Sequence, residues 1–189
     1  NVRHMFREKD PLYLTKLEGE TSSELDTLGA IRALSEVVRN QPDGVETYLA
    51  LGNLYRTRGD YERAIQVRRN IIVRQTLPDN TRAMAYYELG HDYKRSGFLD
   101  RALKAFTEAK KLGAPADAIG LEIARVHAVS GNFEAAAAAF GHLGFHVAEA
   151  HYRTKMGEEF LAKNSPAAAL TCFKKAIKVY PASVEAWLA

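Results

Sequence analysis

Histidine, carboxylate and cysteine side chains are the groups in this chain that could carry out catalysis. His91 and Asp92 are adjacent in the sequence. On a helix, adjacent side chains point about 100° apart, so these two cannot form a dyad directly. Cys172 lies beside Phe173 on an apolar helix face, which favours a small packed thiol over a nucleophile. The sequence has no glycine-rich phosphate loop either, and we expect a protein without enzymatic activity.

Three histidines could form a metal site. His142, His146 and His151 follow one another at spacings of four and five, which could bring two imidazoles to one helix face. Glu149 is the only carboxylate near them, and no cysteine accompanies them. Because zinc sites combine several such ligands, we expect partly buried or surface imidazoles here and no metal or other cofactor in these residues.

The composition is that of an ordinary folded chain. Among 189 residues, 47% are apolar and 26% are charged, and 26 Lys and Arg against 23 Asp and Glu give a net charge of +3. A single cysteine excludes an internal disulfide framework, and no stretch approaches the roughly 18 apolar residues of a membrane span. One stretch is dense in arginine: Arg56, Arg58, Arg63, Arg68, Arg69 and Arg74. Because these residues are spread over several helix faces, nucleic-acid binding is a weaker alternative to protein binding. It predicts salt-sensitive binding to a DNA duplex of random sequence.

A repeated pattern shows which elements position these groups. The motif Leu-Gly-x-x-Tyr occurs at residues 51–55 and 89–93, with related copies around Ala124 and Gly157. The small residues stand at positions 52, 90, 124 and 157, and successive position numbers differ by 38, 34 and 33. Each is followed by a similar order of small and aromatic residues, and the last copy ends in Pro181. A period near 34 with this motif resembles the tetratricopeptide repeat (TPR) family.

The spacing has a physical explanation. Small residues at the glycine slot, and at Ala64, Ala102, Ala136 and Ala169, would let the two helices of a pair approach closely. Gly59, Gly97 and Gly131 fall just after a helix, where a left-handed residue is favoured. The sequence therefore predicts an all-α, right-handed TPR superhelix (α-solenoid) of helix-turn-helix repeats.

The predicted organisation is a short N-terminal segment, 1–24, that is irregular or holds a partial first helix, followed by a TPR array over 25–189. Repeats are expected near 45–78, 83–116, 117–149 and 150–183, with partial repeats at both ends. Residues 26–40 form the second helix of an earlier repeat, whose partner should lie in 10–22. The extra length of the first full repeat falls in the stretch 75–81, where we expect Asp79 or Asn80 to cap the next helix. The array stops in mid-pattern at Trp187, and such a truncated end could let the fragment self-associate.

The first helices of a TPR stack line its concave face, and solenoids usually bind there. Residues at and near inward-pointing positions form a mixed surface with a basic tilt and an aromatic in the middle: Leu49, Asn53, Arg56, Tyr87, His91, Lys94, Arg95, Leu121, Arg125 and Lys155. Such a surface suits an extended or helical peptide, including an acidic one. The alternative is that these are solvated charges with no partner. Leu49 stands where a carboxylate-clamp Lys would be, so we do not expect chaperone-tail binding.

One stretch has a closer resemblance. The run Val45-Glu46-x-x-Leu49-x-Leu51-Gly52-Asn53-Leu54-Tyr55-Arg56-x-Arg58-Gly59 is similar to the bacterial lipopolysaccharide assembly protein B (LapB) family. The similarity continues through Leu89-Gly90-x-Asp92-Tyr93 and Asp100-Arg101-Ala102, and the wider first step between the glycines also fits. It covers about 45–112 well, 26–40 loosely, and 113–189 only as repeats, while 1–24 departs from the family.

The resemblance implies a non-enzymatic adaptor at the bacterial inner membrane. Family members combine an N-terminal membrane helix, a cytoplasmic TPR array and a rubredoxin-like module that holds metal through four cysteines. Their adaptor role helps a membrane-bound AAA protease control the deacetylase that commits material to lipopolysaccharide. We therefore expect a cytoplasmic fragment, tethered to the inner membrane in the full-length protein, that binds a protein or peptide. A TPR adaptor of an unrelated pathway is the alternative.

Overall fold

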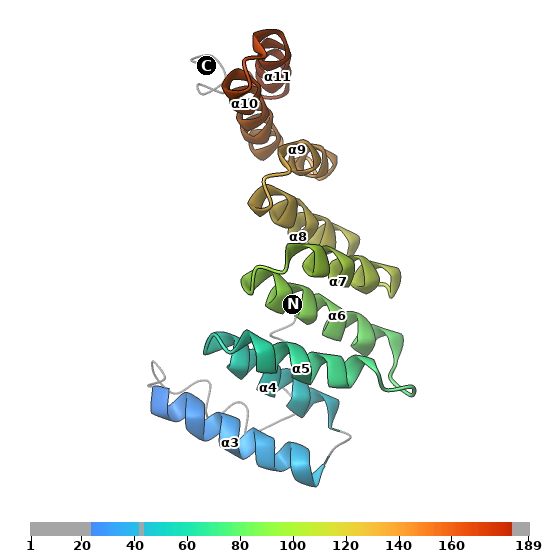
Figure 1. Ribbon diagram of the computed structural model, residues 1–189. Helices are drawn as coiled ribbons and strands as arrows, with labels where there is room; N and C mark the ends of the chain where they lie inside the picture. The colour runs from blue at the N-terminus through green and yellow to red at the C-terminus, as the bar shows by residue number, and fades with distance from the viewer. Residues whose placement is uncertain (1–23, 42–43, 183–189) are drawn as a thin grey trace. The chain divides into compact units, whose positions relative to one another are not determined.

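Helices joined by short connections follow one another along the chain in the computed structural model (Figure 1). The structure describes residues 24–41 and 44–182. Within those ranges it contains nine helices and no strand: α3 (Glu24–Asn40), α4 (Val45–Thr57), α5 (Tyr61–Ile72), α6 (Asp79–Arg95), α7 (Leu99–Lys111), α8 (Ala116–Val129), α9 (Phe133–His142), α10 (His146–Ala162) and α11 (Pro166–Val179). The all-α helix-turn-helix architecture is confirmed. The helix expected within 10–22 and the repeat expected to begin near Trp187 lie outside the described residues.

The chain forms two compact units, residues 1–98 and 99–189. Helices α3 to α6 belong to the first unit and α7 to α11 to the second. The boundary falls between α6 and α7, which are the two helices of the second repeat.

Glycines end the first helices as expected. Gly59, Gly97 and Gly131 have φ angles of 81°, 83° and 76°. In this left-handed conformation a glycine avoids the steric cost that a Cβ atom would bring. The prediction for these three positions is confirmed.

Side-chain caps begin two of the second helices. The Asp60 side chain accepts a hydrogen bond from the Arg63 amide at the start of α5, and Asn132 does the same for the Ala135 amide in α9. The predicted cap of α6 by Asp79 or Asn80 is wrong. Pro78 holds the capping position, with no side-chain bond to the helix. Its fixed φ, here −58°, sets the chain direction so that Asp79 is already the first helical residue.

Small residues of the second helices are buried. Ala64, Ala102, Ala136 and Ala169 are all fully buried. At Gly157 a Cβ atom would overlap Cε1 of Phe173, so α10 and α11 can approach this closely only because the residue is glycine. This confirms the predicted role of the small residue at Gly157.

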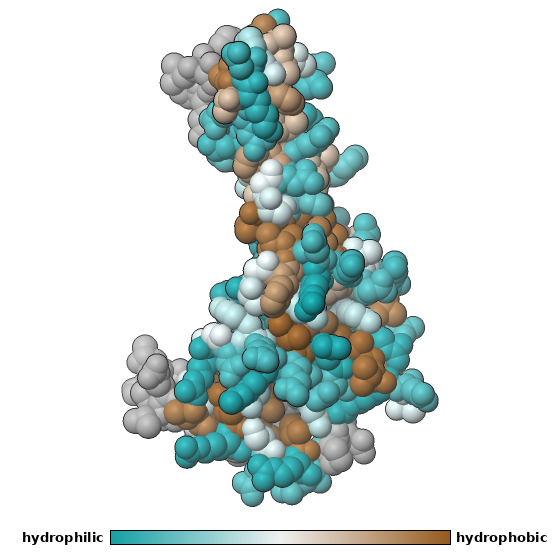
Figure 2. Space-filling view, viewed as in Figure 1, coloured by the Kyte–Doolittle hydropathy of each residue, from teal (hydrophilic) through white to brown (hydrophobic). Residues whose placement is uncertain are grey.

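A hydrophobic cluster joins three helices of the first unit. Leu49 of α4, Ile71 of α5 and Ala85 of α6 pack together with Leu77, which lies in the connection before α6. Arg82 stabilises the same connection, because its Nη2 donates hydrogen bonds to the carbonyl oxygens of Arg74 and Leu77. The extra length of this repeat therefore supplies a core residue rather than a loose loop. On the visible face of this unit, hydrophobic side chains lie among hydrophilic ones (Figure 2).

Two further clusters lie in the second unit. Ala124, Ala136 and Phe140 pack with Tyr152 of α10, and Ala150 packs with Ala176 of α11.

Cys172 is also buried on α11, which supports its interpretation as a packing residue. None of the described helices combines the length and the apolar character that crossing a membrane requires.

Candidate protein-binding face and its buried ion network

In the first unit, the predicted face consists of side chains from α4 and α6. Leu49 does not belong to it: only 2% of the residue is exposed, because it packs into the core beside Ile71. The prediction that Leu49 contacts a partner is therefore wrong. Asn53 and Arg56, one and two turns further along α4, are both partly buried and turn toward α6.

A buried arginine that is not among the residues predicted for this face organises the region. Arg68 of α5 is fully buried, and its Nε donates to Oδ2 of Asp92 at 3.0 Å. Its Nη1 and Nη2 donate to the Leu49 carbonyl oxygen at 3.2 Å and to Asn53 Oδ1 at 2.6 Å. Oε2 of Glu88 lies 3.6 Å from Nη2. One guanidinium thus joins α4, α5 and α6.

Arg56 adds a second guanidinium to the same network. Its Nη2 contacts Glu88 Oε2 at 2.6 Å and Asn53 Oδ1 at 2.8 Å, and its Nη1 contacts Asp92 Oδ1 at 3.1 Å. Two arginines therefore face two carboxylates, and the formal charges cancel. Arg56 was predicted as a cation that meets a partner, but its side chain is only 19% exposed and is already engaged within the chain.

Burial governs the ionisation of the central pair. It raises the pKa of the Asp92 carboxyl, and the positive charges of Arg68 and Arg56 oppose that rise. It also lowers the pKa of the Arg68 guanidinium, and Asp92 and Glu88 oppose that decrease. Desolvation of this kind means that the pair gains little stability over hydrophobic residues, whereas the loss of one partner costs about 3–5 kcal/mol.

The sequence does contain one indication of this network, at a position where the repeats differ. When the repeats are aligned on their small residues, the same column contains Phe106, Phe140 and Phe173, but in the first repeat it contains Arg68. All three phenylalanines are buried. The lack of a Cβ at Gly52 leaves room for the arginine, because that atom would lie 2.8 Å from Arg68 Nη1. An arginine at a buried aromatic position requires buried partners, and Asp92 and Glu88 provide them.

The other predicted residues of the first unit lie along α6. Tyr87, His91 and Arg95 follow one another at a spacing of four and so share one helix face. The rings of Tyr87 and His91 meet edge to face, with centroids 4.6 Å apart. Arg95 is exposed and Lys94 is partly exposed in the last turn of the helix. His91 and Asp92 therefore have different neighbours, as expected for adjacent helical residues.

In the second unit the predicted residues are separate from one another. Leu121 is partly buried against the cluster of Ala124 and Phe140. Arg125 is about half exposed and contacts Glu122 at 2.7 Å. Lys155 contacts Glu158 at 2.8 Å on the surface.

The histidines of this unit show no metal-binding arrangement. Nδ1 of His146 is 3.8 Å from Oε2 of Glu149, which itself binds Arg153. Among the residues that the structure describes, no group of three or more His, Cys, Asp or Glu side chains is placed to hold a metal ion.

Comparison with known families identifies the repeats. The sequence model of the tetratricopeptide repeat family matches residues 26–72, 87–141 and 154–189. The chain belongs to the TPR family. The fold class predicted from the repeat spacing is thereby confirmed, and the first and third matches include residues of the first and fourth predicted repeats.

Curated relatives agree with the resemblance over one stretch. Lipopolysaccharide assembly protein B of Escherichia coli K12 is 33% identical over 79 residues, which are 42% of this TPR chain and 20% of the relative. The same protein of E. coli O157:H7 matches equally well. The matched stretch thus spans about a fifth of the relatives' length.

Solved structures support the fold. MamA is 26% identical, with a TM-score of 0.56 over 82% of this chain and 88% of its own. A putative kinesin light chain of Podosopora anserina, 14% identical with a TM-score of 0.55, covers 82% of this chain and 86% of its own, and shows the fold alone.

Proposed function

We propose that this TPR chain is a non-catalytic scaffold that binds a segment of a partner protein on the α4 and α6 face of its first unit. The TPR family supports the general role, since its solenoids bind proteins on the face lined by first helices. The proposal extends to Arg125 and Lys155 in the second unit as contacts for the same kind of partner.

The stripe on α6 is the observation that carries the proposal. Tyr87 and His91 form a partly exposed aromatic platform, and the cationic residues Lys94 and Arg95 follow it at the end of the helix. An aromatic platform contributes contact area, and a terminal cation favours a partner carboxylate. Arg56 contributes little charge to this face, because Glu88 and Asp92 neutralise it.

Site-specific cross-linking tests this face. A photoreactive phenylalanine analogue would replace Tyr87, and in a matched control it would replace Arg69, which is exposed on the second helix α5. We expect a defined protein adduct from position 87 in living cells and none from position 69. Arg95→Glu should reduce the adduct, whereas Arg69→Glu should not. Equal adducts from both positions would show that the α6 face is not the binding face.

We further propose that the whole protein regulates lipopolysaccharide biosynthesis on the cytoplasmic side of the inner membrane, to which it is tethered. The 33% identity to lipopolysaccharide assembly protein B over 79 residues supports this proposal. Depletion of the protein should change the cellular amount of lipopolysaccharide, and wild-type protein should restore it while the Arg95→Glu form does not. An unchanged amount after depletion would favour a TPR adaptor of an unrelated pathway and leave the binding face untouched.

A further inference from the structure

The carboxamide of Asn53 on the α4 and α6 face is held by two guanidinium groups. Its Oδ1 accepts hydrogen bonds from Nη2 of Arg68 at 2.6 Å and from Nη2 of Arg56 at 2.8 Å. These donors fix which end of the carboxamide points inward, because an amide nitrogen in the same place would meet two N–H donors and accept from neither. The NH2 group of Asn53 therefore points away from both arginines.

The NH2 group of Asn53 is accessible at the surface. It has no hydrogen-bond partner among the residues that the structure describes. In that part of the chain, no buried side-chain nitrogen or oxygen lacks a partner, so an amide nitrogen without one is exposed to solvent. Asn53 as a whole is partly exposed, in agreement with this position. The face thus presents two N–H donors in a fixed direction.

The charges around Asn53 are already balanced. Arg56 contacts Glu88 at 2.6 Å, and Arg68 contacts Asp92 at 3.0 Å. A partner carboxylate would find no unpaired cation among these side chains and would approach two carboxylates. A neutral acceptor avoids that repulsion, and in a peptide the main-chain carbonyl oxygen is such an acceptor.

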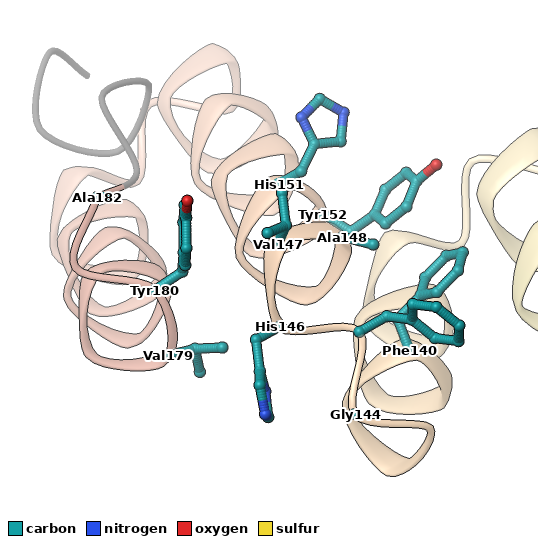
Figure 3. Close-up of a pocket in the computed structure, with 11 residues that line it drawn as sticks. Phe140, Gly144, His146, Val147, Ala148, His151, Tyr152, Val179, Tyr180 and Ala182 are labelled. Carbon is teal, nitrogen blue, oxygen red and sulfur yellow. The ribbon is translucent and has the colours of Figure 1, made fainter.

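Arg68 stands where another repeat uses an aromatic ring for packing alone. The equivalent residue of the third repeat is Phe140, whose ring stacks on Tyr152 with centroids 5.4 Å apart (Figure 3). Arg68 is fully buried, so it cannot meet a partner itself and acts on the surface only through Asn53. A group that is fixed before binding loses less conformational entropy when a partner arrives, which favours affinity.

We infer that Arg68 and Arg56 are positioning residues that hold the Asn53 NH2 group toward a bound peptide, where it donates a hydrogen bond to a main-chain carbonyl oxygen. The inference rests on the proposed role of the α4 and α6 face and names the chemical group that this face recognises. Because every peptide residue has a main-chain carbonyl, this contact sets the path of the peptide and leaves the choice of side chains to the α6 stripe.

Peptides selected on the purified full chain provide the probe. They come from a random library displayed on phage, and those kept for measurement are labelled by the photoreactive group at position 87, which places them on this face. Fluorescence anisotropy measures their affinity. In analogues of one selected peptide, an ester replaces each main-chain amide in turn, because an ester carbonyl oxygen is a weaker hydrogen-bond acceptor than an amide carbonyl oxygen.

Asn53→Asp separates recognition from folding. An aspartate keeps an oxygen that accepts from both arginines, so we expect a melting temperature close to that of wild type, but it has no N–H to donate. Peptide affinity should fall about tenfold or more, at low and at high salt, because salt does not restore a lost hydrogen bond. Asn70→Asp makes the same change at an exposed position of α5 and should leave the affinity unchanged.

The double variant Arg68→Phe with Asp92→Val tests the positioning role. It removes one of the two donors to Asn53 Oδ1 and leaves the donor from Arg56. We expect a folded chain with weaker peptide binding, though the loss should be smaller than for Asn53→Asp. One ester analogue should bind wild type less tightly than the parent peptide does, and should bind Asn53→Asp as well as the parent does.

Several results would overturn the inference. They are no selected peptide that position 87 labels, an affinity unchanged by Asn53→Asp or by the folded double variant, an equal loss with Asn70→Asp, and no ester whose effect depends on Asn53. An adduct between position 87 and residues 1–23 of the same chain would also overturn it, since the occupant would then be the chain itself. A partner adduct in cells that persists in Asn53→Asp would leave the proposed function standing without this inference.

Discussion

The Arg68–Asp92 pair can be replaced by the hydrophobic residues that the chain itself uses at the same repeat positions. Phe106, Phe140 and Phe173 correspond to Arg68, and the buried Val126 corresponds to Asp92. The variants are therefore Arg68→Phe, Asp92→Val and the double substitution. The packing of Phe173 against Gly157 shows how an aromatic ring fills the space beside the repeat glycine.

The expected magnitudes follow from the contacts that each variant leaves. Asp92→Val removes the carboxylate 3.0 Å from Arg68 Nε and leaves only Glu88, at 3.6 Å, to balance a fully buried charge. We expect a loss of about 3–5 kcal/mol in the free energy of unfolding. Arg68→Phe leaves Asp92 with Arg56 at 3.1 Å, so we expect a smaller loss of about 2–3 kcal/mol.

The double substitution removes both buried charges at once. Exchange of a buried ion pair for hydrophobic residues is typically neutral or stabilising, so we expect the double variant to lie within about 1 kcal/mol of wild type. The coupling energy would then be at least about 4 kcal/mol. Arg56 and Glu88 remain paired at 2.6 Å and keep the outer half of the network.

Hydrogen exchange measures this directly. Mass spectrometry of peptides from residues 45–95, read in the full chain, reports the opening free energy of the first unit without assuming that both units unfold together. Peptides from 116–179 serve as the internal control and should exchange as in wild type. Single effects that add to within about 0.5 kcal/mol in the double variant would refute the reasoning, since they would show that the two residues do not act as a unit.

Other perturbations test the packing of both units. Gly157→Ala should lower the free energy of unfolding in urea by about 1–3 kcal/mol, because the added Cβ would overlap the Phe173 ring. Gly29→Ala, in the interior of α3, adds a Cβ that meets no neighbouring side chain within 4 Å, so it should raise the free energy of unfolding by about 0.5–1 kcal/mol. A decrease for Gly29→Ala would contradict this comparison. Asp60→Ala should cost about 1 kcal/mol through loss of the α5 cap, whereas Asp60→Asn should cost little. Cys172 should react with a maleimide much more slowly in the native chain than in denaturant, and fast native alkylation would show that its burial is wrong.

Local patterns in the sequence were sufficient to predict the helices and the residues that end them. Glycine at positions 59, 97 and 131 predicted the left-handed helix ends, and the alanine slots predicted the buried contacts of the second helices. These features depend on residues within one helix pair, so their spacing carries the information. The predicted cap of α6 failed for a local reason too, because Pro78 rather than its successors took the capping position.

The candidate binding face was predicted only in outline. The repeat register selected the helices α4 and α6, but it could not show which of their side chains remain accessible. Leu49 is buried because Ile71 and Leu77, which come much later in the chain, cover it. Repeat periodicity shows which face a residue occupies, but not what the next helix places against it.

The sequence by itself determined that this chain is an all-α TPR array, since close helix contacts require small residues and these recur at a near-constant period. The tertiary structure decided how its charges are used. Arg56 and Arg68 cannot be told from exposed arginines by residue type, and their partners Glu88 and Asp92 lie on another helix, far along the sequence. A long charged side chain can bend toward solvent or toward a carboxylate, and only the packing of α4, α5 and α6 selects the second.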